Sequence, residues 1–182
     1  KYGVTCENAA LNHPAVVRRK QKVVKKLTMG IAAQLKAGNV TVVQEEAEIR
    51  GRVDGGVAVS AAGTEYVGSR LLIATGSMPV LPPIEGLKEC VASGFALTNR
   101  EILDLQEVPK ALVVVGGGVI GLEMASYFAS AGSAVTVVEM LGTVGGPIDA
   151  EIAEMLKAAY EKKGVIFKLG TTAKKFENGK VT

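Results

Sequence analysis

The first half of the chain carries a helical pattern followed by strand patterns. Apolar residues recur at near-helical spacing between Val16 and Leu35, which predicts a helix over residues 14–36 that Gly38 would end. The turn signals DGG and AAG then divide a run of short strand patterns, as expected for an antiparallel meander. We expect these strands at residues 39–43, 47–53, 57–61 and 64–67.

A buried strand and a proline-rich stretch follow. LLIATG (71–76) is an apolar run that ends in Gly, which is typical of a buried strand. SMPVLPPIEG has three prolines in ten residues and predicts a stiff, extended domain boundary. We therefore expect one domain over residues 1–80 and a second over residues 81–182. The first should be the less stable, because its apolar strands would lack sheet partners.

In the second half, apolar strand patterns alternate with helix patterns. A short helix is expected over residues 99–105, and Asp149 is a plausible N-cap for the last helix, which Gly164 would end. The order β-α-β-α-β predicts an α/β fold, half of a doubly wound, Rossmann-like parallel sheet. The expected strands and long helices cover residues 112–115, 119–130, 134–139, 149–164 and 165–169.

The strongest motif is G-x-G-x-x-G at Gly116, Gly118 and Gly121. It follows an apolar strand and opens a helix, which is the context in which this motif binds a dinucleotide. Gly116 would allow the tight turn, Gly118 would let a pyrophosphate approach the backbone, and Gly121 would let helix and strand pack closely. The phosphates would meet free N–H groups at the positive end of the helix dipole. A close-packed turn without a ligand is the alternative.

Two carboxylates accompany this loop. Glu139 ends the next strand, where it can accept hydrogen bonds from the ribose hydroxyls of NAD and would repel the extra phosphate of NADP. The following MLGTVGG offers no cation to hold that phosphate. Glu123 is expected on the first turn of the dinucleotide helix, where it would either cap the helix or lie beside the bound cofactor.

Composition and charge exclude several other functions. The 182 residues carry a net charge of +3 and no apolar run of the roughly 18 residues that a membrane span needs. We expect a soluble, cytoplasmic protein without membrane or nucleic-acid partners, because no aromatics interleave with the basic run at residues 18–26. Cys6 and Cys90 are far apart and His13 is the sole histidine, so neither a metal site nor a Cys-His site is expected.

Three long stretches resemble the pyridine nucleotide-disulfide oxidoreductases: LLIATGSMPVLPPIEG, VVVGGGVIGLEMA and VTVVEMLGTVGGPIDAEIAEML. Within that family, VGG-x-IDAEI is most similar to the dihydrolipoamide dehydrogenases. The resemblance implies electron transfer from dihydrolipoamide through a disulfide and FAD to NAD+. It also implies a homodimeric parent and a lipoyl domain of a 2-oxo acid dehydrogenase or glycine cleavage complex as partner.

The resemblance also implies binding residues for both cofactors. The expected FAD contacts are Ala47, Ala74, Thr75 and Gly76. The expected NAD contacts are Gly116, Gly117, Gly118, Val119, Ile120, Gly121, Leu122, Glu123, Glu139 and Ala173.

The chain also departs from the family. It lacks the first flavin-binding glycine motif, the Cys-x4-Cys redox pair and the interface domain with its His-Glu base, and His13-Pro14 is not followed by a matching Glu. No catalytic residue is therefore assigned, and we expect a central excerpt that binds NAD(H) weakly without turnover. Another flavin disulfide reductase, an NADH oxidase or a non-catalytic NAD-binding module are the alternatives.

Overall fold

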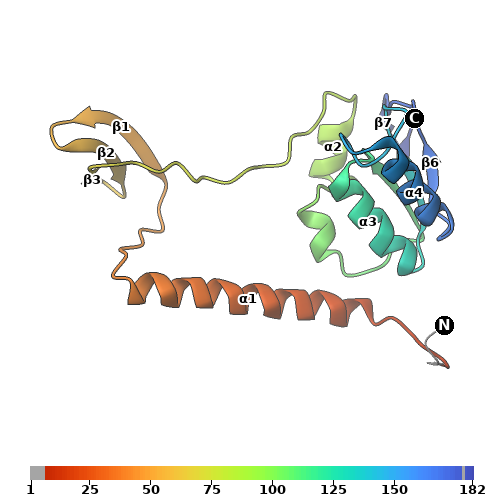
Figure 1. The fold of residues 1–182 in the computed structure, drawn as a ribbon, viewed down its shortest axis with the longest axis horizontal. Coiled ribbons are helices and arrows are strands. Elements are labelled where there is room, and N and C mark those ends of the chain that lie inside the picture. Colours follow the sequence, from red (N-terminus) through yellow and green to blue (C-terminus); the bar gives the residue numbers. More distant parts are fainter. Residues whose placement is uncertain (1–6, 178) are drawn as a thin grey trace. The chain divides into compact units, whose positions relative to one another are not determined.

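The computed structural model describes residues 7–177 and 179–182, and their contacts form two compact units. One unit comprises residues 21–78, and the other comprises residues 79–182 together with residues 7–20 (Figure 1). The assignment of residues 1–80 and 81–182 to a flavin-binding and a nucleotide-binding domain stays a prediction.

The long helix α1 (His13–Ala37) confirms the predicted helix within a residue at each end. Its C-terminus differs in detail from the expectation, because Asn39 rather than Gly38 has the left-handed conformation, with a φ of 55°. The Val40 N–H donates to the Leu35 carbonyl, which closes the Schellman arrangement. Only the first two turns hold buried residues, His13 and Val17, so most of the apolar stripe of α1 is exposed.

The predicted antiparallel meander is confirmed in the unit formed by residues 21–78. Its three strands pair in the order β1-β2-β3, and a register shift between Ile49 and Gly51 marks a bulge in the first strand. Ala58 and Ala61 on the central strand are its buried residues. The strands are β1 (Ala47–Val53), β2 (Gly56–Ala61) and β3 (Thr64–Gly68).

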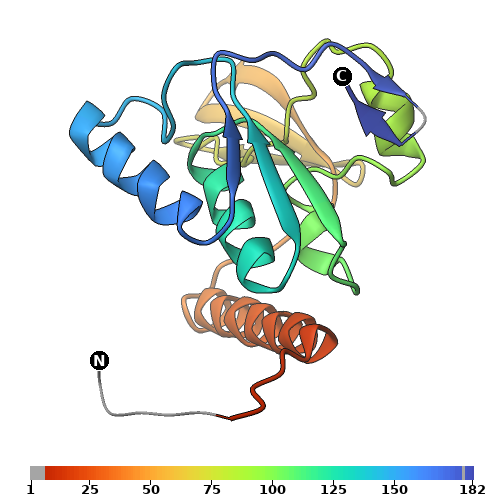
Figure 2. The same ribbon diagram turned by 90° about the vertical axis from the view of Figure 1, so that its right-hand side faces the viewer.

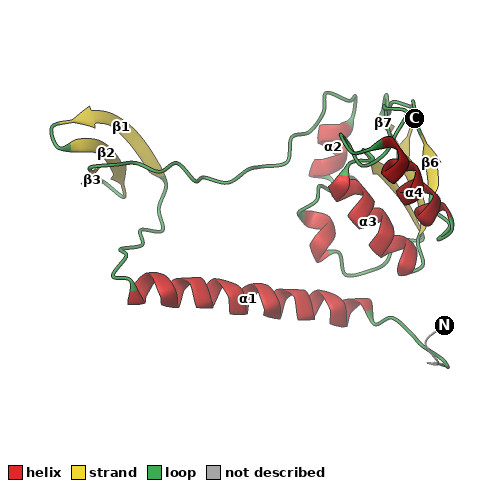
Figure 3. Cartoon of the chain, in the orientation of Figure 1, coloured by secondary structure: helices red, strands yellow, loops and turns green. Residues whose placement is uncertain are grey.

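Two predicted strands of this unit are wrong. Residues 39–43 and 71–76 form no strand, and Figure 3 draws both stretches as loops. Leu72 and Ile73, expected in a buried strand, are 87% and 65% exposed. A strand is held by hydrogen bonds to a neighbouring strand, and among the described residues none pairs with either stretch.

The parallel sheet of the other unit confirms the predicted β-α-β-α-β order (Figure 2). Its strands lie in the sequential order β4-β5-β6, so right-handed crossovers place both connecting helices on the same face. The predicted N-cap is also confirmed, because the Asp149 carboxylate accepts from the N–H groups of Glu151 and Ile152. The elements are β4 (Ala111–Val115), α3 (Val119–Ser130), β5 (Ala134–Val138), α4 (Ala150–Glu161) and β6 (Ile166–Lys168).

Shorter elements flank this sheet. The expected short helix over residues 99–105 is a single 3-10 turn, while the helix at residues 87–92 was not predicted. The chain closes in a two-stranded hairpin, although Asn178 of its turn lies outside the described residues. These elements are α2 (Leu87–Ala92), η1 (Glu101–Asp104), β7 (Phe176–Glu177) and β8 (Lys180–Val181).

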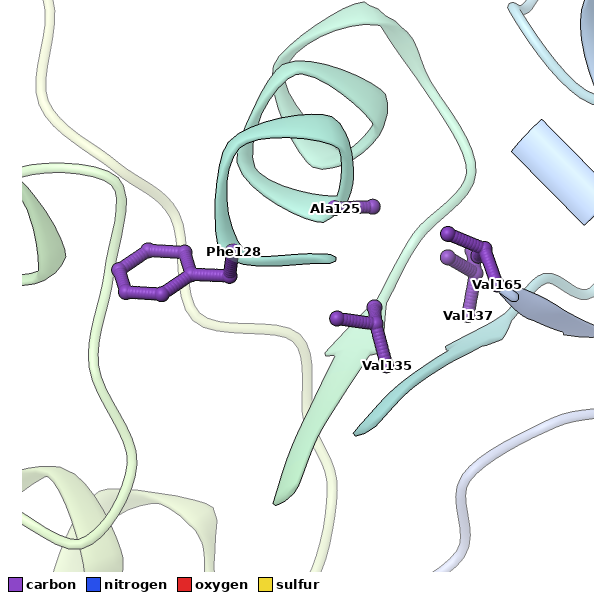
Figure 4. Packing of buried hydrophobic residues seen from close by; sticks show 5 residues of the cluster. All are labelled: Ala125, Phe128, Val135, Val137 and Val165. Carbon is purple, nitrogen blue, oxygen red and sulfur yellow. The ribbon is translucent and has the colours of Figure 1, made fainter. Parts of the chain in front are cut away.

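The core of this unit lies between the sheet and the helices. Figure 4 shows Ala125 and Phe128 of α3 with Val135 and Val137 of β5, and Val165 completes this cluster just before β6. Parallel sheets are usually buried on both faces. Within the described residues it is covered on one face only, since side chains on the opposite face are about half exposed: Val113 (45%), Val115 (42%) and Ile166 (54%).

Candidate nucleotide-binding site

The glycine-rich loop joins β4 to α3 in a tight turn. Gly116 has a φ of 107°, a conformation that L side chains rarely adopt, and its N–H donates to the Val138 carbonyl at 2.8 Å. At Gly121, an ideal Cβ would lie 2.1 Å from the Gly116 carbonyl oxygen and 3.2 Å from Val114. Only glycine at position 121 therefore allows α3 to pack this closely against the end of β4.

Gly118, unlike Gly121, has open space around it. An ideal Cβ on it would meet nothing within 4 Å, so the space in front of this residue is open. Its backbone is extended, with a φ of −72°, and it occupies the N-cap position of α3 without a capping side chain. The missing side chain leaves room for a pyrophosphate, so this loop fits the dinucleotide predicted for it.

The start of α3 offers unpaired amide groups toward that space. The first helical hydrogen bond in the loop runs from the Leu122 N–H to the Gly118 carbonyl at 2.9 Å, so the preceding N–H groups have no acceptor within the helix. The side chains of Val119 and Ile120 are exposed, whereas Leu122 is buried in the core. An anion would therefore be bound by the backbone of this segment, at the positive end of the helix dipole.

Glu139 follows β5 and directs its carboxylate at the glycine-rich loop. Its Oε2 accepts from the Gly117 N–H at 2.6 Å, and its Oε1 accepts from the Leu141 N–H at 2.7 Å. Its backbone carbonyl accepts from the Thr171 N–H. A carboxylate has about four acceptor positions, so Glu139 keeps capacity for the ribose hydroxyls that it is predicted to bind.

Other predicted NAD contacts lie at or near this site. Because α3 begins at Val119, Glu123 lies in its second turn rather than on the first turn as expected, and its side chain is exposed. Ala173 is 6% exposed and packs with Leu87 and Phe176. It lies two residues after Thr171, whose N–H contacts Glu139. The individual NAD contacts remain predictions.

A family model described as pyridine nucleotide-disulphide oxidoreductase matches residues 2–182. The chain belongs to this family. Members of the family use FAD and NAD(H).

Curated relatives of the family have similar sequences but are longer. Dihydrolipoyl dehydrogenase of Acholeplasma laidlawii is 37% identical over 92% of this chain and 48% of its own length. Mitochondrial dihydrolipoyl dehydrogenase of Rattus norvegicus is 35% identical over 98% of this chain and 35% of its own length. The chain thus spans about half, or less, of the length of these relatives.

Two solved structures share the fold of this chain. The HOCl-induced flavoprotein disulfide reductase RclA of Escherichia coli has a TM-score of 0.77 at 27% identity, over 91% of this chain and 37% of that chain. LpdA of Mycobacterium tuberculosis has a TM-score of 0.77 at 23% identity, over 92% of this chain and 37% of that chain, which shows the fold alone.

The residues that the family resemblance assigned to FAD lie in the unit formed by residues 21–78. Ala47 is the first residue of β1 and is exposed. Ala74, Thr75 and Gly76 are exposed in the loop where a strand was expected, and Gly76 has a φ of 74°. Among the described residues, no hydrogen bond joins Ala47 to residues 74–76. The flavin contacts therefore remain predictions.

His13 is buried and hydrogen-bonded to two residues far away in sequence. It is 6% exposed at the start of α1, and its Nδ1 lies 2.8 Å from the Tyr127 hydroxyl. Its Nε2–H donates to the Leu105 carbonyl at 2.8 Å. A carbonyl can only accept, so the neutral ring carries its proton on Nε2 and its Nδ1 accepts from Tyr127. Both ring nitrogens of His13 thus have hydrogen-bond partners.

In the part of the chain that the structure describes, the cysteine and the metal-ligating side chains form no cluster. Cys90 is a free, half-buried thiol, and Cys6 lies outside the described residues. No group of three or more His, Cys, Asp or Glu side chains within residues 7–177 and 179–182 could hold a metal ion. No helix there is long and apolar enough to cross a membrane.

Sequence reasoning missed one part of the site, the segment after Glu139. Gly145 donates its N–H to the Gly117 carbonyl at 2.8 Å, and both Val144 and Gly145 are buried. The available signal was the VGG triplet directly after the acidic strand end, because consecutive glycines mark positions of unusual backbone conformation. Gly145 and Gly146 have φ values of 85° and 75°.

Proposed function

We propose that this chain is the central part of a dihydrolipoyl dehydrogenase, which passes electrons from dihydrolipoamide through a disulfide and FAD to NAD+. The observation that carries the proposal is the glycine-rich loop, open at Gly118 and bordered by the Glu139 carboxylate. The similarity to dihydrolipoyl dehydrogenases over at least nine-tenths of the chain supports it.

The chain's own residues would bind and orient the nicotinamide cofactor. The N–H groups at the start of α3 would bind the pyrophosphate, while Glu139 would accept from the ribose hydroxyls. FAD, when bound, supplies the hydride chemistry. Residues Ala47 and 74–76 would contact it. The negative charge of Glu139 would repel the 2′-phosphate of NADP, so NAD is the preferred cofactor.

Fluorescence titration of the 182-residue chain with NADH and with NADPH tests this proposal. We expect weak binding of NADH and weaker binding of NADPH, because Glu139 opposes the additional phosphate. Equal or tighter binding of NADPH would contradict the assigned role of Glu139. Binding of neither cofactor would contradict the proposed function of the glycine-rich loop.

The purified chain should show no formation of NADH from NAD+ and dihydrolipoamide, even with added FAD, because the given sequence has no Cys-x4-Cys redox pair. In the parent, the proposed partner is the lipoyl domain of a 2-oxo acid dehydrogenase or glycine cleavage complex. We also propose that the parent is a cytoplasmic homodimer. Turnover by the isolated chain would contradict the proposal that the chain binds NAD(H) but lacks the redox pair needed for the reaction.

A second candidate is another flavin-dependent disulfide reductase. The observation that favours it is the similarity to RclA, whose fold matches over 91% of this chain. The two candidates differ in the disulfide substrate, so an assay of the parent enzyme with dihydrolipoamide separates them. Reduction of NAD+ by dihydrolipoamide supports the first candidate, and its absence in an enzyme with NADH oxidation activity supports the second.

A further inference from the structure

The Gly117 residue is held from two directions by the segment that follows β5. Its N–H donates to the Glu139 carboxylate at 2.6 Å, and its carbonyl accepts from the Gly145 N–H at 2.8 Å. Gly117 is buried, so these bonds are shielded from water.

These two bonds set the orientation of two successive peptide planes. A trans peptide points its C=O and its N–H in opposite directions. The Gly117 carbonyl and the Gly118 N–H share one plane, so the bond from Gly145 directs the Gly118 N–H away from residues 141–146. The Gly116 carbonyl and the Gly117 N–H share the preceding plane, which Glu139 holds.

The segment that holds the loop is itself anchored. The Leu141 N–H donates to Glu139, and the Leu141 carbonyl accepts from the Gly170 N–H at 3.0 Å. Val144 is 1% exposed. An ideal Cβ on Gly145 would lie 2.5 Å from Ile148 Cδ1, so a side chain there would force Ile148 to move.

We propose that Gly145 is a positioning residue for the dinucleotide site, which presets the glycine-rich loop through the Gly117 carbonyl before the dinucleotide binds. The inference rests on the proposed function of that loop. A preset loop avoids the entropic cost of ordering it on binding, so it binds the same ligand more tightly.

A pair of neighbouring glycine variants tests this role. Gly145→Ala introduces a methyl group against Ile148, whereas Gly146→Ala introduces the same backbone strain at a position where the methyl meets nothing within 4 Å. We expect Gly145→Ala to weaken NADH affinity about five- to tenfold relative to Gly146→Ala, the equivalent of about one lost hydrogen bond. Amide hydrogen exchange of Gly117, measured by NMR without nucleotide, should be faster in Gly145→Ala only.

Equal NADH affinity and equal Gly117 exchange in the two variants would overturn the proposal. The unmodified chain gives a further test that does not depend on the folding of a variant. If the loop is preset as proposed, the Gly145 amide should be protected from exchange equally with and without NADH. Protection that appears only with NADH would overturn the preset loop. Failure of the chain to bind NADH, with the exchange difference intact, would contradict the proposed function alone.

Discussion

At the scale of single residues, identical glycines of one motif have different surroundings. Gly121 faces the Gly116 carbonyl, where a Cβ would lie 2.1 Å away, whereas a Cβ on Gly118 would meet nothing within 4 Å. The spacing of the motif predicted both residues. The distances assign a packing role to Gly121 and leave open space at Gly118.

This difference predicts opposite effects for two alanine variants. Gly121→Ala should destabilise the chain by about 1–3 kcal/mol, the usual cost of overpacking, because α3 must move away from β4. Gly118→Ala should cost less than about 1 kcal/mol, as an N-cap change does, yet weaken NADH binding because its methyl enters the open space. Urea denaturation and NADH titration of both variants would separate the effects, and equal destabilisation would contradict the assignment.

Glu101, the first residue of the 3-10 turn η1, accepts two hydrogen bonds from Thr98. The Thr98 N–H and hydroxyl both donate to the Glu101 carboxylate, at 2.8 and 2.5 Å. The hydroxyl is the main reason that the pKa of Glu101 lies below its ordinary value of 4.5. The depressed pKa means that this contribution to stability is present above pH 4.5 and is lost as the pH falls through the folded value.

Removing the Thr98 hydroxyl should change the pKa of Glu101. In Thr98→Val, the pKa of Glu101 should rise toward its ordinary value, because the carboxylate keeps the backbone donor and loses the side-chain donor. Thr98→Ser retains the hydroxyl and should titrate as the original chain does. Carboxyl carbon shifts measured by NMR against pH would show this, and an unchanged Glu101 pKa in Thr98→Val would contradict the assigned cause.

At the scale of elements, α1 has one end packed against other residues and a long exposed remainder. Its first two turns contact Tyr127 of α3 and Leu105 through His13, while Val23, Leu27 and Ile31 are 46%, 63% and 58% exposed. The helical spacing predicted the length of α1 because local periodicity sets helix formation. It could not show which turns are covered, since burial depends on residues far away in sequence.

The contact between His13 and Tyr127 predicts a measurable stability difference. Tyr127→Phe removes the hydroxyl donor and leaves the buried Nδ1 of His13 unsatisfied, so it should cost about 1–3 kcal/mol in the free energy of unfolding. Tyr160→Phe is the matched control, because that ring packs on Phe167 and its hydroxyl forms no hydrogen bond with a described residue. Similar unfolding free energies for the two variants would contradict the structural role of His13.

At the scale of the whole molecule, the two units differ in how many apolar side chains they bury. The unit containing the parallel sheet has a continuous buried cluster around Phe128, Val135 and Val137. In residues 21–78, by contrast, the buried apolar side chains are Ala58 and Ala61 of the meander. Little buried apolar area means little stabilisation from burial.

This contrast predicts the course of limited proteolysis. Trypsin should cut first at exposed sites such as Arg70, and a fragment containing residues 79–182 should persist longest, because segments with few buried contacts open most readily. Mass spectrometry of the digest over time would identify the fragments. Persistence of residues 47–68 as long as residues 111–169 would contradict the expected difference in stability.

The sequence by itself determined the features that depend on neighbouring positions. Helix α1, the meander, the alternation of β4 to β6 with two helices, and the Asp149 cap follow from side-chain period, turn residues and capping chemistry, which act over a few residues. The family is readable from the same motifs, because the glycine-rich turn needs particular residues at particular spacings.

The tertiary structure alone decided the features that depend on distant residues. LLIATG has the composition of a buried strand, yet it forms none because no described strand pairs with it. The VGG triplet marks Gly145 in the sequence, but Gly145 becomes a partner of Gly117 only when the loop after β5 folds against the glycine-rich turn. Strand pairing and hydrogen bonds between loops require both partners in place, and local sequence carries information about only one of them.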